Sequence, residues 1–146
     1  MKILITGATG FVGQTLIPQL QKQHSQVDIL TLNRSVRKAE IMYPSDTYPC
    51  VKHTYADDWK QVKLFNPELV VHLAAFNTSS NDSEVINSLV STNITYGILL
   101  LDALSQCESL KLFINTGSFS EYRWGTSCFK SAYLYLSLIH ISEPTR

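Results

Sequence analysis

The first feature of the chain that could do chemistry is a glycine-rich segment directly after the short apolar run of residues 3–5. It reads Thr6-Gly7-Ala8-Thr9-Gly10-Phe11-Val12-Gly13. A strand, a glycine turn and a helix start, in this order, can hold the pyrophosphate of a dinucleotide. Gly7 permits a sharp turn, Gly10 leaves room for a phosphate, and Gly13 allows close packing of the helix. The first N–H groups of the helix and the positive end of its dipole would then bind the phosphates.

The elements around this segment predict an α/β fold. Apolar runs typical of strands cover residues 2–6, 27–33, 51–55, 69–74 and 111–116. Helical patterns cover residues 11–23, 59–65 and 84–107, and residues 34–41 form a short helix or a loop. Because crossovers between parallel strands are right-handed, we expect a doubly wound parallel sheet of the Rossmann type with strand order 3-2-1-4-5. Its ligand crevice should lie at the carboxyl ends of strands one and four.

Composition narrows the class of protein. The chain has 146 residues, 45% hydrophobic and 16% charged, with a formal net charge of zero. These values fit one soluble globular domain, and without a basic patch we expect no nucleic-acid partner. Apolar stretches shorter than ten residues predict no membrane span. Three widely spaced cysteines, Cys50, Cys107 and Cys128, indicate reduced thiols in the cytoplasm and neither a disulfide framework nor a metal site.

The end of the second predicted strand bears on the choice of cofactor. An acidic residue there would bind the 2′-hydroxyl of NAD and repel the 2′-phosphate of NADP. The chain instead has Asn33, which is neutral and can donate a hydrogen bond, followed by Arg34, which can fork onto phosphate oxygens. Arg37 and Lys38 could assist, or they could be the solvated start of a helix. The sequence therefore favours NADP, with NAD as the second possibility.

With its preceding threonine, the glycine-rich segment resembles the extended short-chain dehydrogenase/reductase superfamily, also called the NAD-dependent epimerase/dehydratase family. The resemblance runs from Met1 to about Tyr135. It implies an incomplete NAD(P)-binding Rossmann domain at residues 1–135, truncated before the substrate domain of the full family fold. It also implies a nucleotide-linked sugar as the substrate of the intact parent, with a homodimer as a possible assembly.

The same resemblance implies further cofactor contacts. Asp57 would bind the adenine amino group, and its neighbour Asp58 is suited to be the N-cap of the next helix. His72-Leu73-Ala74-Ala75 resembles the family's H-x-A-A strand end, where small side chains let the backbone approach the cofactor. In that segment we expect His72 to be packed at the sheet and not catalytic. Asn93 would support the active site through backbone contacts, unless it is an ordinary polar helix residue.

The catalytic residues implied by the resemblance follow the fifth predicted strand. Ser118, with Thr116 and Ser120 as alternatives, would hydrogen-bond the reacting oxygen. Tyr135, with Tyr133 as the alternative, would be the proton donor of a Y-x-x-x-K motif. A lysine four residues later would lower the pKa of the tyrosine, which is otherwise near 10. Position 139 is isoleucine, so we expect this chain to be nearly inactive even if its parent is an enzyme.

The last eleven residues, 136–146, match in order the translation of a transposase-based sequencing adapter. We interpret them as adapter-derived and non-native, and exclude them from the expected fold and site. Two functions remain open. One is a fragment of an NADP-dependent nucleotide-sugar reductase, epimerase or dehydratase that transfers hydride to or from a sugar carbon. The other is a non-catalytic, sensor-like NADP-binding module, and a parental lysine four residues after Tyr135 would favour the enzyme.

Overall fold

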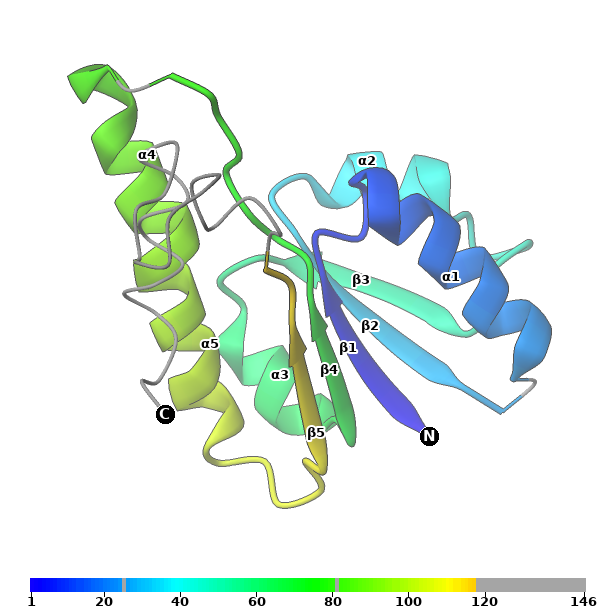
Figure 1. Cartoon of the computed structure of the whole chain (residues 1–146). Helices are drawn as coiled ribbons and strands as arrows, with labels where there is room; N and C mark the ends of the chain where they lie inside the picture. Colours follow the sequence, from blue (N-terminus) through cyan, green and yellow to red (C-terminus); the bar gives the residue numbers. More distant parts are fainter. Residues whose placement is uncertain (25, 81, 118–146) are drawn as a thin grey trace, which may run out of the picture. The chain divides into compact units, whose positions relative to one another are not determined.

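The computed structural model of the chain describes residues 1–24, 26–80 and 82–117 (Figure 1). Five parallel strands form one sheet in the order β3-β2-β1-β4-β5, which confirms the predicted topology. The strands are β1 (Lys2–Thr6), β2 (Asp28–Asn33), β3 (Val51–Tyr55), β4 (Leu69–His72) and β5 (Leu112–Asn115). The described residues fall into two units, Met1–Ala74 with Leu100–Asn115, and Ala75–Leu99 with residues 116 and 117. The sheet belongs to the first unit.

The connecting segments of the sheet are α1 (Phe11–Gln23), α2 (Val36–Met42) and α3 (Trp59–Phe65). A longer helix, Ser83–Leu104, precedes β5. It consists of a 3-10 turn η1 (Ser83–Val85), α4 (Ile86–Val90), a π-helical turn η2 (Ser91–Thr95) and α5 (Tyr96–Leu104). The prediction of one long helix over residues 84–107 is confirmed except for its end, because the helix stops at Leu104. Its π-helical turn was not predicted, since apolar periodicity alone does not reveal one.

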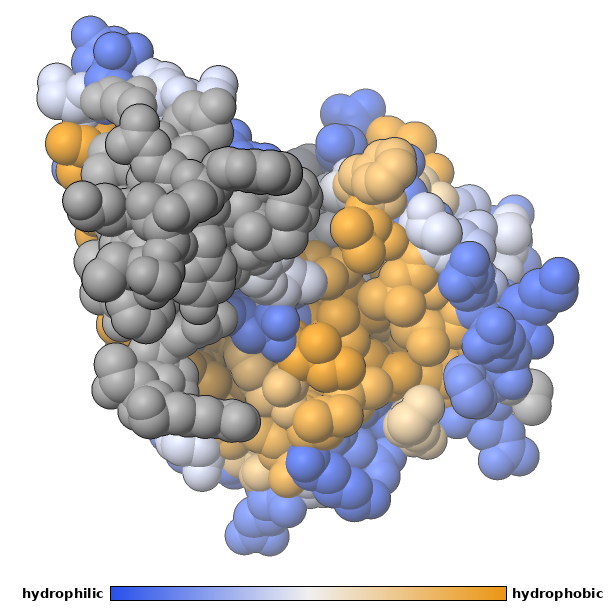
Figure 2. All heavy atoms as spheres, in the orientation of Figure 1, coloured by the Kyte–Doolittle hydropathy of each residue, from blue (hydrophilic) through white to orange (hydrophobic). Residues whose placement is uncertain are grey.

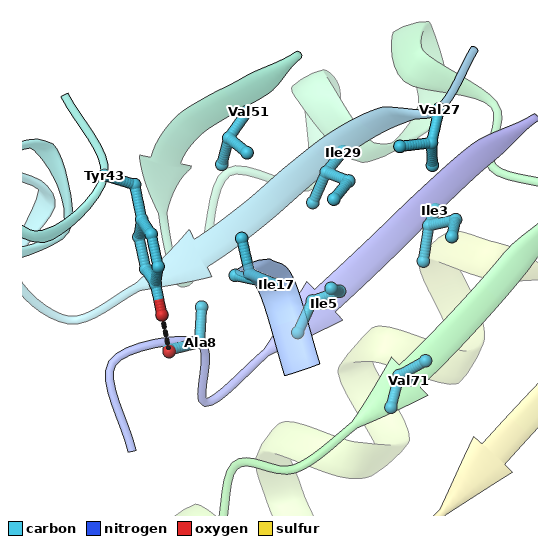
Figure 3. Close-up of a cluster of buried hydrophobic side chains, with 9 residues drawn as sticks. All are labelled: Ile3, Ile5, Ala8, Ile17, Val27, Ile29, Tyr43, Val51 and Val71. Atoms are coloured by element: carbon cyan, nitrogen blue, oxygen red, sulfur yellow. Dashed lines mark hydrogen bonds between the residues drawn. The ribbon is translucent and has the colours of Figure 1, made fainter. Parts of the chain in front are cut away.

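The first core cluster lies between α1 and one face of the sheet (Figure 3). Ile17 of α1 is fully buried against strand residues that alternate along β1 and β2. Because side chains alternate across a strand, only every second residue of β1 contributes to this cluster. Its buried members are Ile3, Ile5, Ala8, Ile17, Val27, Ile29, Tyr43, Val51 and Val71.

The second cluster covers the opposite face and includes residues of α3 and α5. Val62 of α3 and Leu100 of α5 are fully buried against Leu4 and Val70. With helices on both faces, the central strands have apolar residues on both sides, which explains why they appear as near-continuous apolar runs in the sequence. Apolar burial on both faces fixes the register that brings the ends of β1 and β4 together, with Thr6 opposite His72.

Part of the sheet on the α1 side remains open to solvent. The register pairs Leu112 with Leu69 and Ile114 with Val71, which places these β5 residues on the same face as the first cluster. Leu112 is 54% exposed and Ile114 is 41% exposed. Figure 2 shows apolar residues gathered on the sheet beside α1. The apolar face of the sheet therefore extends beyond what α1 covers.

Among the described ranges, Ser83–Leu104 is one helix that is long and apolar enough to cross a membrane by length and composition. The sequence prediction of no span rested on the absence of a long uninterrupted apolar run. The helix reaches this hydropathy without such a run because it carries few charges, and 11% of its apolar window is buried inside the structure. Its final turns carry Leu100, Ala103 and Leu104, which are buried members of the second core cluster.

Candidate dinucleotide-binding site

The glycine turn is held against the end of β4 by close backbone packing. Gly7 has a φ of +69°, a left-handed conformation that L side chains rarely adopt. A Cβ at this position would lie 2.7 Å from the backbone nitrogen of Ala74 and 2.8 Å from the carbonyl oxygen of Leu73. Both the dihedral angle and the space therefore require glycine. The turn closes with a hydrogen bond from the Gly10 N–H to the Gly7 carbonyl at 2.9 Å.

The start of α1 leaves its N–H groups without a side-chain cap. Gly10 is the N-cap residue, with no side chain to accept from the first turn, and no acidic residue lies in that turn. Phe11 is 90% exposed and Val12 is 54% exposed. A Cβ on Gly13 would overlap the backbone of Ala8. Gly13 was predicted to let the helix pack close to the strand, and the structure shows that it packs the helix against the turn. The result is an open, uncapped helix N-terminus, which is suited to an anion.

Thr6 and His72 join the ends of β1 and β4 beneath this turn. The Thr6 hydroxyl oxygen accepts from the Ala74 N–H at 3.1 Å. Its own proton can therefore go to Nδ1 of His72, 2.6 Å away. Burial lowers the pKa of His72 to about 4, so the ring is neutral at physiological pH and Nδ1 can accept. The predicted packing of His72 at the sheet agrees with its burial, and the expectation that it is not catalytic stays a prediction.

The H-x-A-A segment departs from the predicted strand boundary. β4 ends at His72, not at Ala74, because the Ala74 N–H bonds the Thr6 side chain instead of continuing the ladder. The Leu73 N–H still bonds the Thr6 carbonyl at 3.2 Å. Leu73 and Ala74 are half-buried and lie directly against Gly7. Ala75 is exposed and belongs to the second unit.

At the end of β2, Asn33 and Arg34 differ sharply in their surroundings. Asn33 is 5% exposed, and its amide nitrogen donates to the carbonyl of Thr31 at 2.9 Å and to the Thr31 hydroxyl at 2.8 Å. The expected donor at this position is thus used within the sheet. Arg34 is exposed and makes no hydrogen bond or ion pair with another residue that the structure describes. Next to it, a shallow depression of about 430 Å³ runs along α2 and includes Arg37 and Lys38.

The two aspartates after β3 have separate roles in the structure. Asp58 caps α3: one carboxylate oxygen accepts from the Gln61 N–H at 3.2 Å, and the other accepts from the Thr54 hydroxyl at 2.6 Å. This agrees with the N-cap predicted for Asp58. Asp57 is exposed, and among residues 1–24, 26–80 and 82–117 none forms a hydrogen bond with its side chain. Its carboxylate is available for the adenine contact implied by the resemblance, which stays a prediction.

Within the second unit, Asn93 makes the backbone contacts implied for it. Its side-chain oxygen accepts from the Phe76 N–H at 2.8 Å, and its side-chain nitrogen donates to the Phe76 carbonyl at 3.0 Å. Asn93 lies in the π-helical turn η2. Turns of this kind are frequent at functional sites. This pair of bonds fixes the segment that follows the H-x-A-A strand end. Ser118 and Tyr135, together with residues 136–146, lie outside the described residues.

One group of polar residues was missed by the sequence reasoning. Tyr43, Thr31 and His53 are hydrogen-bonded to one another or to the glycine turn, and Tyr43 and Thr31 are buried. The available signal was a threonine inside the otherwise apolar β2, paired in register with His53 of β3. A buried polar residue needs partners, so such a pattern indicates a side-chain network.

A doubly wound parallel sheet with a glycine turn, an uncapped helix start and a basic residue after β2 defines a Rossmann dinucleotide-binding domain. The profile of the NAD dependent epimerase/dehydratase family matches residues 3–139. The chain belongs to this family, as its glycine-rich segment predicted.

Comparisons with individual proteins agree with this assignment. CDP-abequose synthase of Yersinia pseudotuberculosis is 26% identical over 122 residues, which is 84% of this chain and 41% of that protein. UDP-glucose-4-epimerase of Stenotrophomonas maltophila, solved with NAD and formylated UDP-arabinopyranose, superposes with a TM-score of 0.72 at 17% identity. That match covers 97% of this chain and 46% of the epimerase.

A dehydrogenase of known structure has a similar fold. L-threonine dehydrogenase of Clostridium difficile superposes with a TM-score of 0.68 at 18% identity, covering 94% of this chain and 45% of that one. The two structural likenesses show a shared fold alone. The chain spans less than half the length of each of these three proteins.

Proposed function

We propose that the chain is the dinucleotide-binding part of an NADP-dependent enzyme that acts on a nucleotide-linked sugar. The observation that carries the proposal is the uncapped α1 N-terminus behind the Gly7 turn, where a pyrophosphate would meet free N–H groups. Thr6, Gly10, Phe11, Val12 and Gly13 complete the pyrophosphate cradle. Family membership and the likeness to CDP-abequose synthase support this class of chemistry.

The preference for NADP rests on Arg34. It is exposed directly after β2, where the adenosine ribose is expected, and no acidic side chain at the strand end repels a phosphate. A guanidinium can form two parallel hydrogen bonds with phosphate oxygens. Asp57 would contact the adenine, while Leu73, Ala74 and Ala75 would line the cofactor and Asn93 would hold the adjoining backbone.

The test is a titration of the chain with NADPH and NADH. Loss of a charged hydrogen bond costs about 1.5–3 kcal/mol, so we expect Arg34→Asp to weaken NADPH binding about 10- to 100-fold. Lys22→Asp, the same reversal of charge in the last turn of α1, is the matched control. Equal affinities of the unmodified chain for both cofactors would contradict the NADP preference. Binding of neither would contradict the dinucleotide-binding function.

In the intact cytoplasmic parent, hydride would pass between the nicotinamide and a sugar carbon. Ser118 would orient the reacting oxygen, and Tyr135 would exchange the proton. A second candidate is a non-catalytic NADP-binding module, which the absence of a lysine four residues after Tyr135 in the parent would favour. The parental residue at that position, combined with an assay of NADPH oxidation by nucleotide-sugar ketones, distinguishes the two.

A further inference from the structure

A buried hydrogen bond ties the glycine turn to the end of α2. The Tyr43 hydroxyl donates to the carbonyl oxygen of Ala8 at 2.8 Å, in the middle of the turn (Figure 3). Tyr43 is 2% exposed, and Ala8 is fully buried. Burial, with Tyr48 as a smaller cause, raises the pKa of Tyr43 to about 12, so the hydroxyl stays protonated and remains a donor.

This hydroxyl is the hydrogen-bond donor that the Ala8 carbonyl depends on. Within the described part of the chain, no other N–H or O–H group donates to the Ala8 oxygen. Gly13 packs against the same carbonyl, since a Cβ there would lie 2.3 Å from its oxygen, but a Cα has no polar hydrogen to donate. A buried carbonyl without a donor is unfavourable. The polar preference for the present orientation of this peptide therefore comes from Tyr43.

The direction of the Ala8 carbonyl also fixes the direction of the next N–H group. The peptide bond between Ala8 and Thr9 is trans, so its C=O and its N–H point in opposite directions. Because the carbonyl points to the buried Tyr43 hydroxyl, the Thr9 N–H points away from it. Among residues 1–24, 26–80 and 82–117, no acceptor bonds this N–H. It is a free donor two residues before the uncapped α1 begins at Phe11.

Contacts outside the glycine turn keep Tyr43 in place. Its N–H donates to the carbonyl of Ala39 at 2.8 Å, where Tyr43 forms the C-cap of α2. Its carbonyl lies 3.2 Å from Nε2 of His53, which carries the hydrogen because a carbonyl can only accept. The ring of Tyr48 packs edge-on against the Tyr43 ring, with centroids 5.3 Å apart. The hydroxyl is thus presented to the turn by a residue that is anchored independently of the turn.

We propose that Tyr43 is a positioning residue of the dinucleotide site, whose hydroxyl holds the Ala8–Thr9 peptide so that the Thr9 N–H is free to bind a phosphate oxygen. The inference rests on the proposed binding of a dinucleotide at the glycine turn. The Thr9 N–H then adds one donor to the free N–H groups in the first turn of α1. Tyr43 acts through the backbone and not by touching the ligand. Its effect is therefore confined to ligands that carry a diphosphate.

Tyr43→Phe tests this role because it removes the hydroxyl and keeps the ring. The loss of one neutral hydrogen bond predicts that NADPH binds about 2- to 10-fold more weakly. Adenosine 2′-monophosphate lacks the diphosphate, so its dissociation constant should change by less than about 2-fold. Tyr48→Phe removes the same group from the neighbouring ring and is the matched control, with neither ligand affected. If the chain binds NADH only, NADH and adenosine replace the two probes.

A second readout follows the Thr9 N–H itself. In an N–H correlation spectrum of the unmodified chain, we expect the Thr9 signal to shift when NADPH is added. In Tyr43→Phe the signal should already differ in the free chain, because the peptide has lost its anchor, and its response to NADPH should be smaller. Tyr48→Phe should leave both the signal and its response as they are.

The outcomes separate this inference from the function on which it rests. Unchanged NADPH binding in Tyr43→Phe, or equal weakening of both nucleotides, would overturn the inference and leave the dinucleotide site in place. A Thr9 signal that does not move when NADPH binds the unmodified chain would also overturn it. This last measurement decides if Tyr43→Phe fails to fold or if the adenosine probe binds too weakly to measure. Failure of the unmodified chain to bind either NADPH or NADH refutes the proposed function and this inference with it.

Discussion

The starts of α1 and α3 differ in how the free N–H groups of the first helical turn are satisfied. Both helices begin with N–H groups that have no partner within the helix. At α3 the carboxylate of Asp58 accepts from the first turn, so the protein satisfies its own donors. At α1 the N-cap is Gly10, and no side chain accepts. The difference teaches that an uncapped helix, supported from outside by a tight turn, is a place where a ligand can supply the missing acceptor.

The support from outside comes from β4, and it also explains why α1 can begin without a cap. Gly7 packs against the Leu73–Ala74 backbone, and Thr6 binds both His72 and Ala74. At the start of α3 the cap itself is supported by a second bond, from the Thr54 hydroxyl to the Asp58 carboxylate. The site is therefore held by strand-to-turn packing, while α3 is held by local capping.

The largest expected effect comes from breaking that packing. Gly7→Ala would place a methyl group 2.7–2.8 Å from backbone atoms of Leu73 and Ala74, closer than van der Waals contact, and force a non-glycine residue into a left-handed conformation. Left-handed strain of about 1–2 kcal/mol and overpacking of about 1–3 kcal/mol together predict a loss of roughly 2–5 kcal/mol in the free energy of unfolding. Urea denaturation measures this loss. Gly10→Ala is the control, since Gly10 has an ordinary negative φ and one contact at 3.1 Å.

An unfolding free energy that is unchanged in Gly7→Ala would show that the turn can relax away from β4. In that case the packing of Gly7 against the Leu73–Ala74 backbone would not be what holds the start of α1.

The next effect is a loss of stability at acid pH through His72. Its pKa falls from 6.5 in the unfolded chain to about 4 in the fold, because burial disfavours the charged ring. The unfolded state thus binds more protons in this range, so stability is complete above about pH 6.5 and falls as pH drops toward 4. The difference in pKa corresponds to at most about 3 kcal/mol. Unfolding measured at several pH values should show the decline.

His72→Gln should flatten this part of the pH profile, whereas His24→Gln, at an exposed residue, should leave it as it is. A decline that persists undiminished in His72→Gln would mean that another group causes it.

The smallest effect comes from exchanging the two kinds of helix start. Gly10→Asp supplies α1 with a cap, so we expect nucleotide affinity to fall at least about 10-fold while unfolding changes by less than about 1 kcal/mol. Asp58→Ala removes the cap of α3, with an expected loss of about 1 kcal/mol in stability and no change in nucleotide affinity. Paired titration and denaturation of both variants check this. Tight nucleotide binding by Gly10→Asp would refute the role assigned to the α1 start.

Several parts of the fold and site could be predicted from local patterns. The bounds of β1, α1, β3 and α3 follow from apolar runs bounded by turn residues, and the strand order follows from the handedness of crossovers. The need for glycine at position 7 and the capping role of Asp58 also follow from sequence position. The π-helical turn could not be predicted, because one additional residue per turn leaves little trace in apolar periodicity. Ser118 and Tyr135 remain predictions.

By itself the sequence determined the class of this protein, because a glycine turn between a strand and a helix has steric and electrostatic requirements that few residue types meet. Only the tertiary structure decided what the polar residues beside that turn do. The Asn33 amide nitrogen faces inward because Thr31 on the same strand and the Thr54 carbonyl on the paired strand β3 accept from it. Thr6 bonds the backbone of a segment 68 residues away. Such contacts depend on which strands become neighbours, and burial then leaves each polar atom a single choice of partner.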